Sequence, residues 1–205
     1  MNIDFENSMV RRAMAAVVPD RTIFVGVDLG KLQSHSAIVV VERFEELPTN
    51  HVDVLRGVGA RMRYIVRHAE RVALDTDYTM VVMRVKQVVK QLETRGMCIV
   101  VVDETGVGVA VVEGMRDAAM GCPVNPIKIS SGQQATGRSV PREELLTRMK
   151  MMAERGELEI AEGCLHGEYL KRELVHLRLE AGRSGGEKDD LAFALALACW
   201  RARVR

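Results

Sequence analysis

The sequence predicts an α/β fold with a mixed five-stranded sheet, in which three antiparallel strands precede parallel ones and helices flank the sheet. Three observations support this prediction. Short runs of β-branched residues recur along the chain, the first three runs follow one another without a helix, and later runs alternate with apolar residues at helical spacing. Strands joined by hairpins are antiparallel, whereas strands connected through helices are parallel.

The first three strands are expected to form a meander. Residues 22–28 (TIFVGVD) read as a buried strand, and residues 36–43 (SAIVVVER) read as its hairpin partner. A loop that contains Gly30 joins them. The third strand is expected over residues 62–74, after a loop rich in turn residues.

The middle of the chain alternates helices with strands. Apolar residues at helical spacing predict helices over residues 78–95 and 107–120, each followed by a glycine. Residues 97–103 (MCIVVVD) form the most apolar run and are expected at the centre of the sheet. Residues 123–129 contain two prolines, so this strand is expected at an edge.

The last third of the chain is predicted to be mainly helical. Residues 130–140 are rich in Ser, Gly, Gln and Thr and read as a loop, and Pro141 then occupies the first turn of a helix. A short strand over 157–161 and a helix over 168–179 follow. The final helix, 189–203, is apolar on most faces and is expected to pack deeply.

Composition limits the class of protein. The 205 residues are 47% hydrophobic, which is enough for the core of one domain. The net charge is only +1, so the protein as a whole does not attract nucleic acid through a general positive charge. We expect a domain over 21–205 with a helical appendage over 1–20. The N-terminus resembles no signal peptide, no run is long enough to span a membrane, and the four scattered cysteines are expected to be reduced, as in a cytoplasmic protein.

Acidic residues occur where three of the predicted elements begin or end. Asp28 closes the first strand, Asp103 closes the central strand, and Asp189 and Asp190 open the final helix. Carboxylates from separate elements at one sheet edge are suitable ligands for a hard divalent cation such as Mg²⁺, which prefers oxygen. Two such ions can stabilise both the attacking and the leaving oxygen of a phosphodiester. The pattern therefore indicates a metal-dependent nuclease.

Each aspartate also has a purely structural interpretation. Asp28 is a common kind of residue in a turn after a strand. Asp103 precedes a glycine-containing segment (ETGVG), where an N-cap or an Asx turn is expected, and that segment is also suited to hold a phosphate. Asp189 and Asp190 favour the dipole at the start of a helix. A metal site requires that folding brings the four aspartate side chains close together.

Basic residues near these positions are candidates for binding DNA. Lys31 follows the first strand, and Lys188 directly precedes the Asp pair. The segment GQQATGRSVPR contains Arg138 and Arg142 among small and polar residues, as expected of a loop that contacts a DNA backbone.

A row of arginines in the third strand has two interpretations. The four share a parity, so in a regular strand they would project from one face as a phosphate track or as a solvated outer face: Arg61, Arg63, Arg67 and Arg71. The five histidines show no helix-spaced pair, so a zinc centre is not expected.

Several blocks resemble the nuclease domain of phage terminase large subunits. They are GVDLGKLQSHSAIVVVER, YIVRHAERVALDTDY, VVDETGVGVAVVE, VPREELLTRMKMMAERGELEI and EKDDLAFALALACW, in this order from about Thr22 to the C-terminus. The resemblance implies the ribonuclease H-like fold. It differs at Ser34-His35, where members often have an acidic residue, and at Lys188, where they often have histidine.

The resemblance implies roles for particular residues. Asp28, Asp103 and Asp190 would bind two catalytic Mg²⁺ or Mn²⁺ ions, with Asp189 beside them. It also implies cleavage of concatemeric double-stranded DNA during genome packaging in the host cytoplasm, with a packaging ATPase, the small terminase and the portal as partners. The chain contains no GxxxxGK[ST] motif, so the ATPase motor is expected elsewhere.

Three alternative functions are also consistent with the sequence. GVDLGK and DETGVG also resemble the phosphate loops of actin-like and sugar-kinase-like ATPases, although those proteins need two copies of such a fold. A DNA-binding or assembly module that no longer cuts would retain the fold and lose the reaction. A junction resolvase of the same fold would prefer branched DNA.

Overall fold

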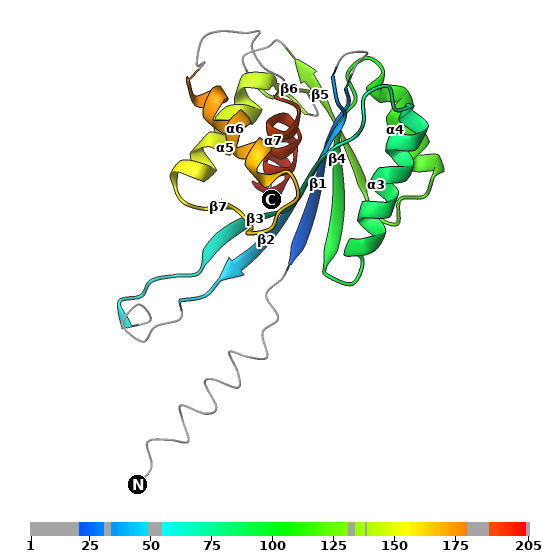
Figure 1. The fold of residues 1–205 in the computed structure, drawn as a ribbon. Coiled ribbons are helices and arrows are strands. Elements are labelled where there is room, and N and C mark those ends of the chain that lie inside the picture. The colour runs from blue at the N-terminus through cyan, green and yellow to red at the C-terminus, as the bar shows by residue number, and fades with distance from the viewer. Residues whose placement is uncertain are drawn as a thin grey trace.

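The computed structural model describes residues 21–30, 34–48, 55–130, 134–137, 139–179 and 189–203. The predicted appendage over 1–20 lies outside this part of the chain. One seven-stranded sheet runs through the molecule in the order β6-β5-β4-β1-β2-β3-β7. Helices α3 and α4 cover one face, and α5, α6 and α7 cover the other (Figure 1).

The first three strands form the predicted antiparallel meander. β1 (Thr22–Asp28), β2 (Ala37–Glu46) and β3 (Arg61–Arg71) pair in sequence order. β1 also pairs in parallel with β4 (Met97–Asp103), which lies near the middle of the sheet as its apolar composition predicts. The remaining strands are parallel to their neighbours: β5 (Val124–Ser130), β6 (Ser139–Pro141) and β7 (Leu158–Ile160).

The sheet has seven strands and not the predicted five. The short strand expected over residues 157–161 is present as β7 and joins the sheet beside β3, whereas β6, only three residues long, was not predicted. The prediction that the proline-containing strand lies at the edge was therefore wrong, since β6 lies outside β5. β6 pairs only with Lys128, Ile129 and Ser130, whereas Pro126 opposes Val102 of β4. Pro126 thus has a strand on only one side, and a missing N–H is tolerated at such a position.

The helices agree with the predicted positions, with shifted ends: α3 (Tyr78–Leu92), α4 (Gly108–Asp117), α5 (Arg142–Glu154), α6 (Gly167–Leu179) and α7 (Asp190–Arg203). Alternate strand residues bury their side chains on the two faces. Ile23, Val25 and Val27 pack with α3 and α4, whereas Phe24 packs with α5, α6 and α7. The molecule consequently has two apolar cores.

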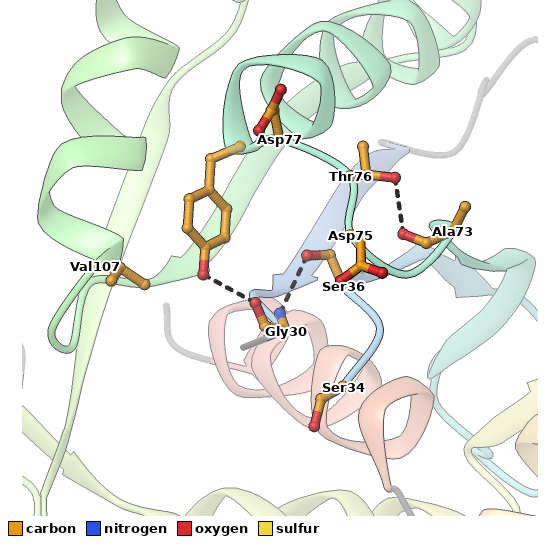
Figure 2. Close-up of a pocket in the computed structure, with 9 residues that line it drawn as sticks. Gly30, Ser34, Ser36, Ala73, Asp75, Thr76, Asp77 and Val107 are labelled. Atoms are coloured by element: carbon orange, nitrogen blue, oxygen red, sulfur yellow. Dashed lines mark hydrogen bonds between the residues drawn. The ribbon is translucent and has the colours of Figure 1, made fainter. Parts of the chain in front are cut away.

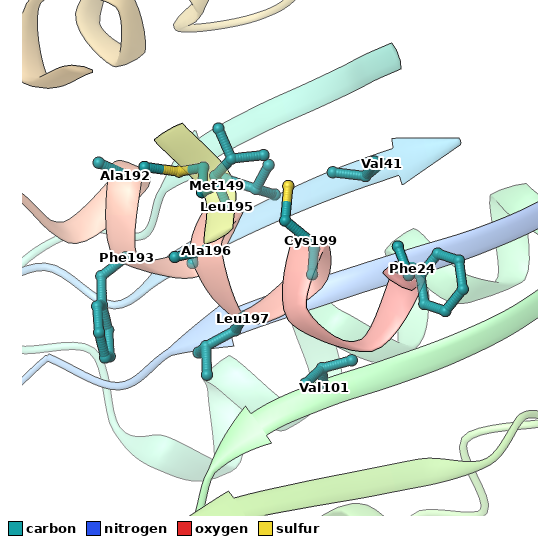
Figure 3. Close-up of a cluster of buried hydrophobic side chains, with 14 of the residues drawn as sticks. Phe24, Val41, Val101, Met149, Ala192, Phe193, Leu195, Ala196, Leu197 and Cys199 are labelled. Atoms are coloured by element: carbon teal, nitrogen blue, oxygen red, sulfur yellow. The ribbon is translucent and has the colours of Figure 1, made fainter. Parts of the chain in front are cut away.

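Helix α7 is the most buried helix, as its composition predicts. Alanines alternate with larger residues, and 11 of its 14 residues are buried. Phe24, Val41 and Val101 of the sheet lie against it (Figure 3). The approach is close at Gly26 in β1, where an added Cβ would lie 1.9 Å from the carbonyl oxygen of Ala194. Only a residue without a side chain fits there.

A β-bulge interrupts the third strand. Val40 opposes His68 but Val41 opposes Val66, so Arg67 is an extra residue in β3. Because of this residue, Ala69 joins the same core as Val66 although their parities differ. The prediction that the arginine row occupies one face was therefore wrong, and Arg71 lies on the face covered by α6 and α7.

Three of the four arginines of this row form ion pairs. Arg63 binds Glu159 of β7, at 2.9 Å, and Arg67 binds Glu42 of β2, at 2.6 Å. Arg71 binds Glu173 of α6. These pairs explain the row better than a phosphate track does, because their charges are already balanced by glutamates.

We predict that Gly26→Ala destabilises the protein by about 1–3 kcal/mol or more, because the new methyl group overlaps the backbone of α7. Urea unfolding would measure the change. Gly114→Ala in α4 is the matched control, since its Cβ would meet only Val82 Cγ2, at 3.8 Å. It should be neutral or stabilise by up to about 1 kcal/mol. Equal effects of the two substitutions would contradict the close packing of α7 on β1.

Candidate metal centre

Two of the predicted aspartates lie side by side at one edge of the sheet. β1 and β4 are parallel neighbours, and their register pairs Val27 with Val102. Asp28 and Asp103, the last residues of these strands, therefore lie next to each other. The strands end there because tight turns follow, and both turns depend on glycine: a Cβ on Gly30 would lie 2.1 Å from Ser34 O, and one on Gly108 would lie 2.1 Å from Asp103 O.

Helix α7 brings the other two aspartates to the same edge. The helix packs against β1, β2 and β4, and its first residue is Asp190, which is buried. Asp189 lies just before it, and its carbonyl accepts the Phe193 N–H, at 2.8 Å. All four predicted metal ligands thus come to the region where β1 and β4 end.

The electrostatics of Asp28 show how close these groups are. The pKa of Asp28 is raised from its ordinary value of 3.8 to about 7, chiefly by burial and in addition by the negative charges of Asp190, Asp103 and Asp189. The guanidinium of Arg142 opposes them. Repulsion of this kind is typical of sites that hold cations, although buried structural networks also perturb pKa values.

The acidic edge, where Asp28, Asp103, Asp189 and Asp190 lie, also carries a cation, Arg142. It follows β6 as the first residue of α5, and its guanidinium forms an ion pair with the carboxylate of Asp189. The guanidinium carbon also lies 4.3 Å from the centre of the Phe193 ring. Of the residues predicted to bind DNA, Arg142 is described by the structure and lies beside the aspartates. Lys31, Arg138 and Lys188 fall outside the described residues.

The donor set suits a hard divalent cation, because all four groups supply carboxylate oxygens. In the arrangement described here, however, no three His, Cys, Asp or Glu side chains of the described residues are close enough to hold a metal ion. Asp103 Oδ1 accepts the Thr105 N–H at 2.8 Å, in the predicted Asx turn, and Asp189 is bound to Arg142. These two carboxylates would have to turn toward Asp28 to share an ion.

A buried glutamate beside this edge escaped the sequence prediction. Glu173 of α6 accepts hydrogen bonds from Arg71 and from the backbone N–H of Ala192 in α7. Burial raises the pKa of Glu173, whereas those hydrogen bonds lower it. No local signal marks Glu173, because its neighbours in sequence are those of an ordinary charged helix and its burial depends on how α6 packs on α7.

A polar pocket lies beside the acidic edge, between the ends of β1 and β3 and the start of α4 (Figure 2). The Tyr78 hydroxyl donates to Gly30 O, at 2.9 Å, and Gly30 N–H donates to the Ser36 hydroxyl, at 3.1 Å. Asp75 and Asp77 also line the pocket, and no basic residue does so among the described residues. These contacts hold the turn after Asp28 in place.

Known proteins offer similarity in structure and not in sequence. No family model and no curated protein sequence matches the chain. The large terminase nuclease of the thermophilic phage G20c, solved with bound zinc, has a TM-score of 0.53 and 23% identity. The alignment covers 87% of this chain and 80% of that one.

Two further structures match less closely. A mutant gp2c of the large terminase subunit from bacteriophage Sf6, solved with calcium, has a TM-score of 0.49 and 12% identity over 88% of each chain. RuvC of Thermus thermophilus has a TM-score of 0.38 and 17% identity over 86% of this chain and 90% of its own. The predicted fold is confirmed: the chain has the ribonuclease H-like α/β fold of a large terminase nuclease domain.

We predict that Asp28 lowers the stability of the metal-free protein as pH rises. In EDTA, the folded chain keeps the Asp28 proton up to about pH 7, whereas the unfolded chain loses it near 3.8. The folded state therefore binds more protons between these values, so the free energy of unfolding falls by up to about 4 kcal/mol from pH 4 to pH 7.

The substitution Asp28→Asn removes this titration. Its stability should depend less on pH, and it should exceed that of the wild type at pH 8, as measured by urea unfolding at pH 5 and pH 8. Asp117→Asn, at the exposed end of α4, is the control and should follow the wild type. Parallel pH profiles for all three proteins would show that Asp28 is not in a charge-repelling environment.

Proposed function

We propose that the chain is a metal-dependent endonuclease of the terminase large-subunit type, which hydrolyses phosphodiester bonds in double-stranded DNA. The observation that carries this proposal is the meeting of Asp28, Asp103, Asp189 and Asp190, from two strands and a helix, at one edge of the sheet. The ribonuclease H-like fold supports it, because the terminase nuclease of phage G20c has this fold.

Asp28, Asp103 and Asp190 would hold Mg²⁺ or Mn²⁺, with Asp189 as an adjacent ligand. Bound divalent ions supply an activated water and charge stabilisation for the leaving 3′ oxygen. Asp28 is central among the aspartates, because it feels the charge of each of the other three. If two ions bind, Asp28 is therefore the ligand that would serve both.

Arg142 has two roles in this proposal. Without a metal, its guanidinium offsets part of the negative charge of the aspartates. When a metal neutralises them, the Arg142–Asp189 pair is no longer needed and the guanidinium becomes available for a DNA phosphate. We propose that Lys31, Arg138 and Lys188 add backbone contacts, since each is close in sequence to Asp28, Arg142 or Asp189.

The biological setting follows from the same proposal. A nuclease of this type would cut concatemeric DNA during packaging in the bacterial cytoplasm, with a packaging ATPase, the small terminase and the portal as partners. Among the described helices, none is both long and apolar enough to cross a bilayer. A DNA-binding module without cleavage is the second candidate, because the described carboxylates do not yet converge on one ion.

We predict that Asp28→Asn, Asp103→Asn and Asp190→Asn each reduce Mn²⁺-dependent plasmid nicking by more than about 100-fold, beyond the loss typical of residues that only support metal ligands. Circular dichroism would check that the fold is kept, and Asp117→Asn would serve as the active control. Cleavage at the wild-type rate by any of the three removes that residue from the site. Plasmid binding without cleavage in Mg²⁺ and Mn²⁺ would favour the non-cleaving module.

We predict that Arg142→Met weakens duplex binding and reduces the slope of log affinity against log salt by about 1, as expected when one phosphate contact is lost. Methionine keeps an apolar side chain over Phe193. Fluorescence anisotropy in Ca²⁺, at several salt concentrations, would measure both quantities. Arg116→Met, exposed on α4, is the matched control. An unchanged slope for Arg142→Met would mean that Arg142 serves only to balance the aspartates.

A further inference from the structure

Glu173 links the acidic edge to the third strand. This side chain of α6 is only 7% exposed and points at the first turn of α7. Its Oε2 accepts the Ala192 N–H, at 2.8 Å, and its Oε1 accepts a hydrogen bond from Arg71 Nη2, at 2.5 Å. The carboxylate thus contacts a helix and a strand at once, and both of its oxygens are engaged.

The contact with Ala192 provides a side-chain cap for the first turn of α7. The first N–H groups of a helix have no partner within the helix and are usually satisfied by the side chain just before it. In α7 that residue is Asp189, whose carboxylate is bound to Arg142. Glu173 therefore supplies the acceptor from another helix, two residues after Asp190.

We propose that Glu173 is a positioning residue for the metal centre, which fixes the first turn of α7 so that Asp190 faces Asp28, and that Arg71 holds Glu173 in place. This inference rests on the proposed function of the aspartates. Glu173 is not itself assigned as a ligand, because a metal would have to take an oxygen from either Arg71 or Ala192. Removing the Glu173 carboxylate would also leave Arg71 without this counter-charge, which is costly for a buried ion pair.

The chain offers a matched control for a merely stabilising ion pair. Glu42 of β2 is also 7% exposed, and it binds an arginine of the same strand β3, Arg67, at 2.6 Å, together with Arg21, at 3.0 Å. Glu42 opposes Ile23, near the start of β1, and so lies toward the other end of the strand from Asp28. Its loss should cost stability without moving α7.

The experiment measures Mn²⁺ affinity by isothermal titration calorimetry and amide hydrogen exchange at Ala192, in the full chain. Glu173→Ala should weaken Mn²⁺ binding about 10–100-fold, as is typical when a residue supporting metal ligands is lost. It should also speed exchange at Ala192 in the absence of metal. Glu42→Ala should change neither property. Glu173→Gln keeps a carbonyl for Ala192 and should show a smaller loss.

The outcomes separate this inference from the proposed function. If the wild type binds Mn²⁺ and Glu173→Ala binds it equally well, the positioning role is overturned and the proposed function stands. If the wild type binds no Mn²⁺, both are overturned. An equal loss in Glu42→Ala overturns the specific role, because general loosening would then suffice. If Glu173→Ala does not fold, Glu173→Gln is compared with Glu42→Gln. Weaker Mn²⁺ binding by Glu173→Gln alone supports the positioning role, and equal Mn²⁺ affinities of the two variants overturn it.

Discussion

The arrangement of this molecule depends on the packing of α7 directly on β1. The two backbones approach closely at Gly26, and this contact sets the height and direction of the helix over the sheet. Asp190 then lies at the same edge as Asp28, although the two residues are far apart in sequence. Everything else at the acidic edge, including the pairing of Arg142 with Asp189, is arranged around a helix whose position is fixed by apolar contacts.

That packing has an electrostatic cost. Burial of Asp28, together with the charges of the three neighbouring carboxylates, raises its pKa to about 7, and the guanidinium of Arg142 offsets only part of this effect. A protein selected for stability alone would not be expected to keep such a group of like charges beside a buried helix. Burial of apolar side chains in the two cores offsets this repulsion. The ion pair between Glu173 and Arg71 places a further carboxylate close to the acidic edge.

The sequence was a good guide to elements with strong local patterns. β1 and β4 are runs of β-branched residues that end in aspartate, and α7 is apolar on most faces, so their positions and the aspartates at their ends were predictable. The strand β6 was not predicted, because three residues carry little pattern, and β7 was expected as a short strand but its place in the sheet was not. The bulge at Arg67 was hidden because nothing local distinguishes an inserted residue from regular alternation. Arg142 and Glu173 show the same limit, since their partners are defined only by how helices pack.

The order of these elements along the chain has a consequence for biosynthesis. β1 leaves the ribosome early, whereas α7 is the last of the described elements to be made. Until α7 docks, Asp28 and Asp103 lack Asp189 and Asp190 beside them, and the face of the sheet that α7 covers stays open to solvent. The acidic edge can therefore be completed only after translation has passed α7, so a nascent or truncated chain would lack it.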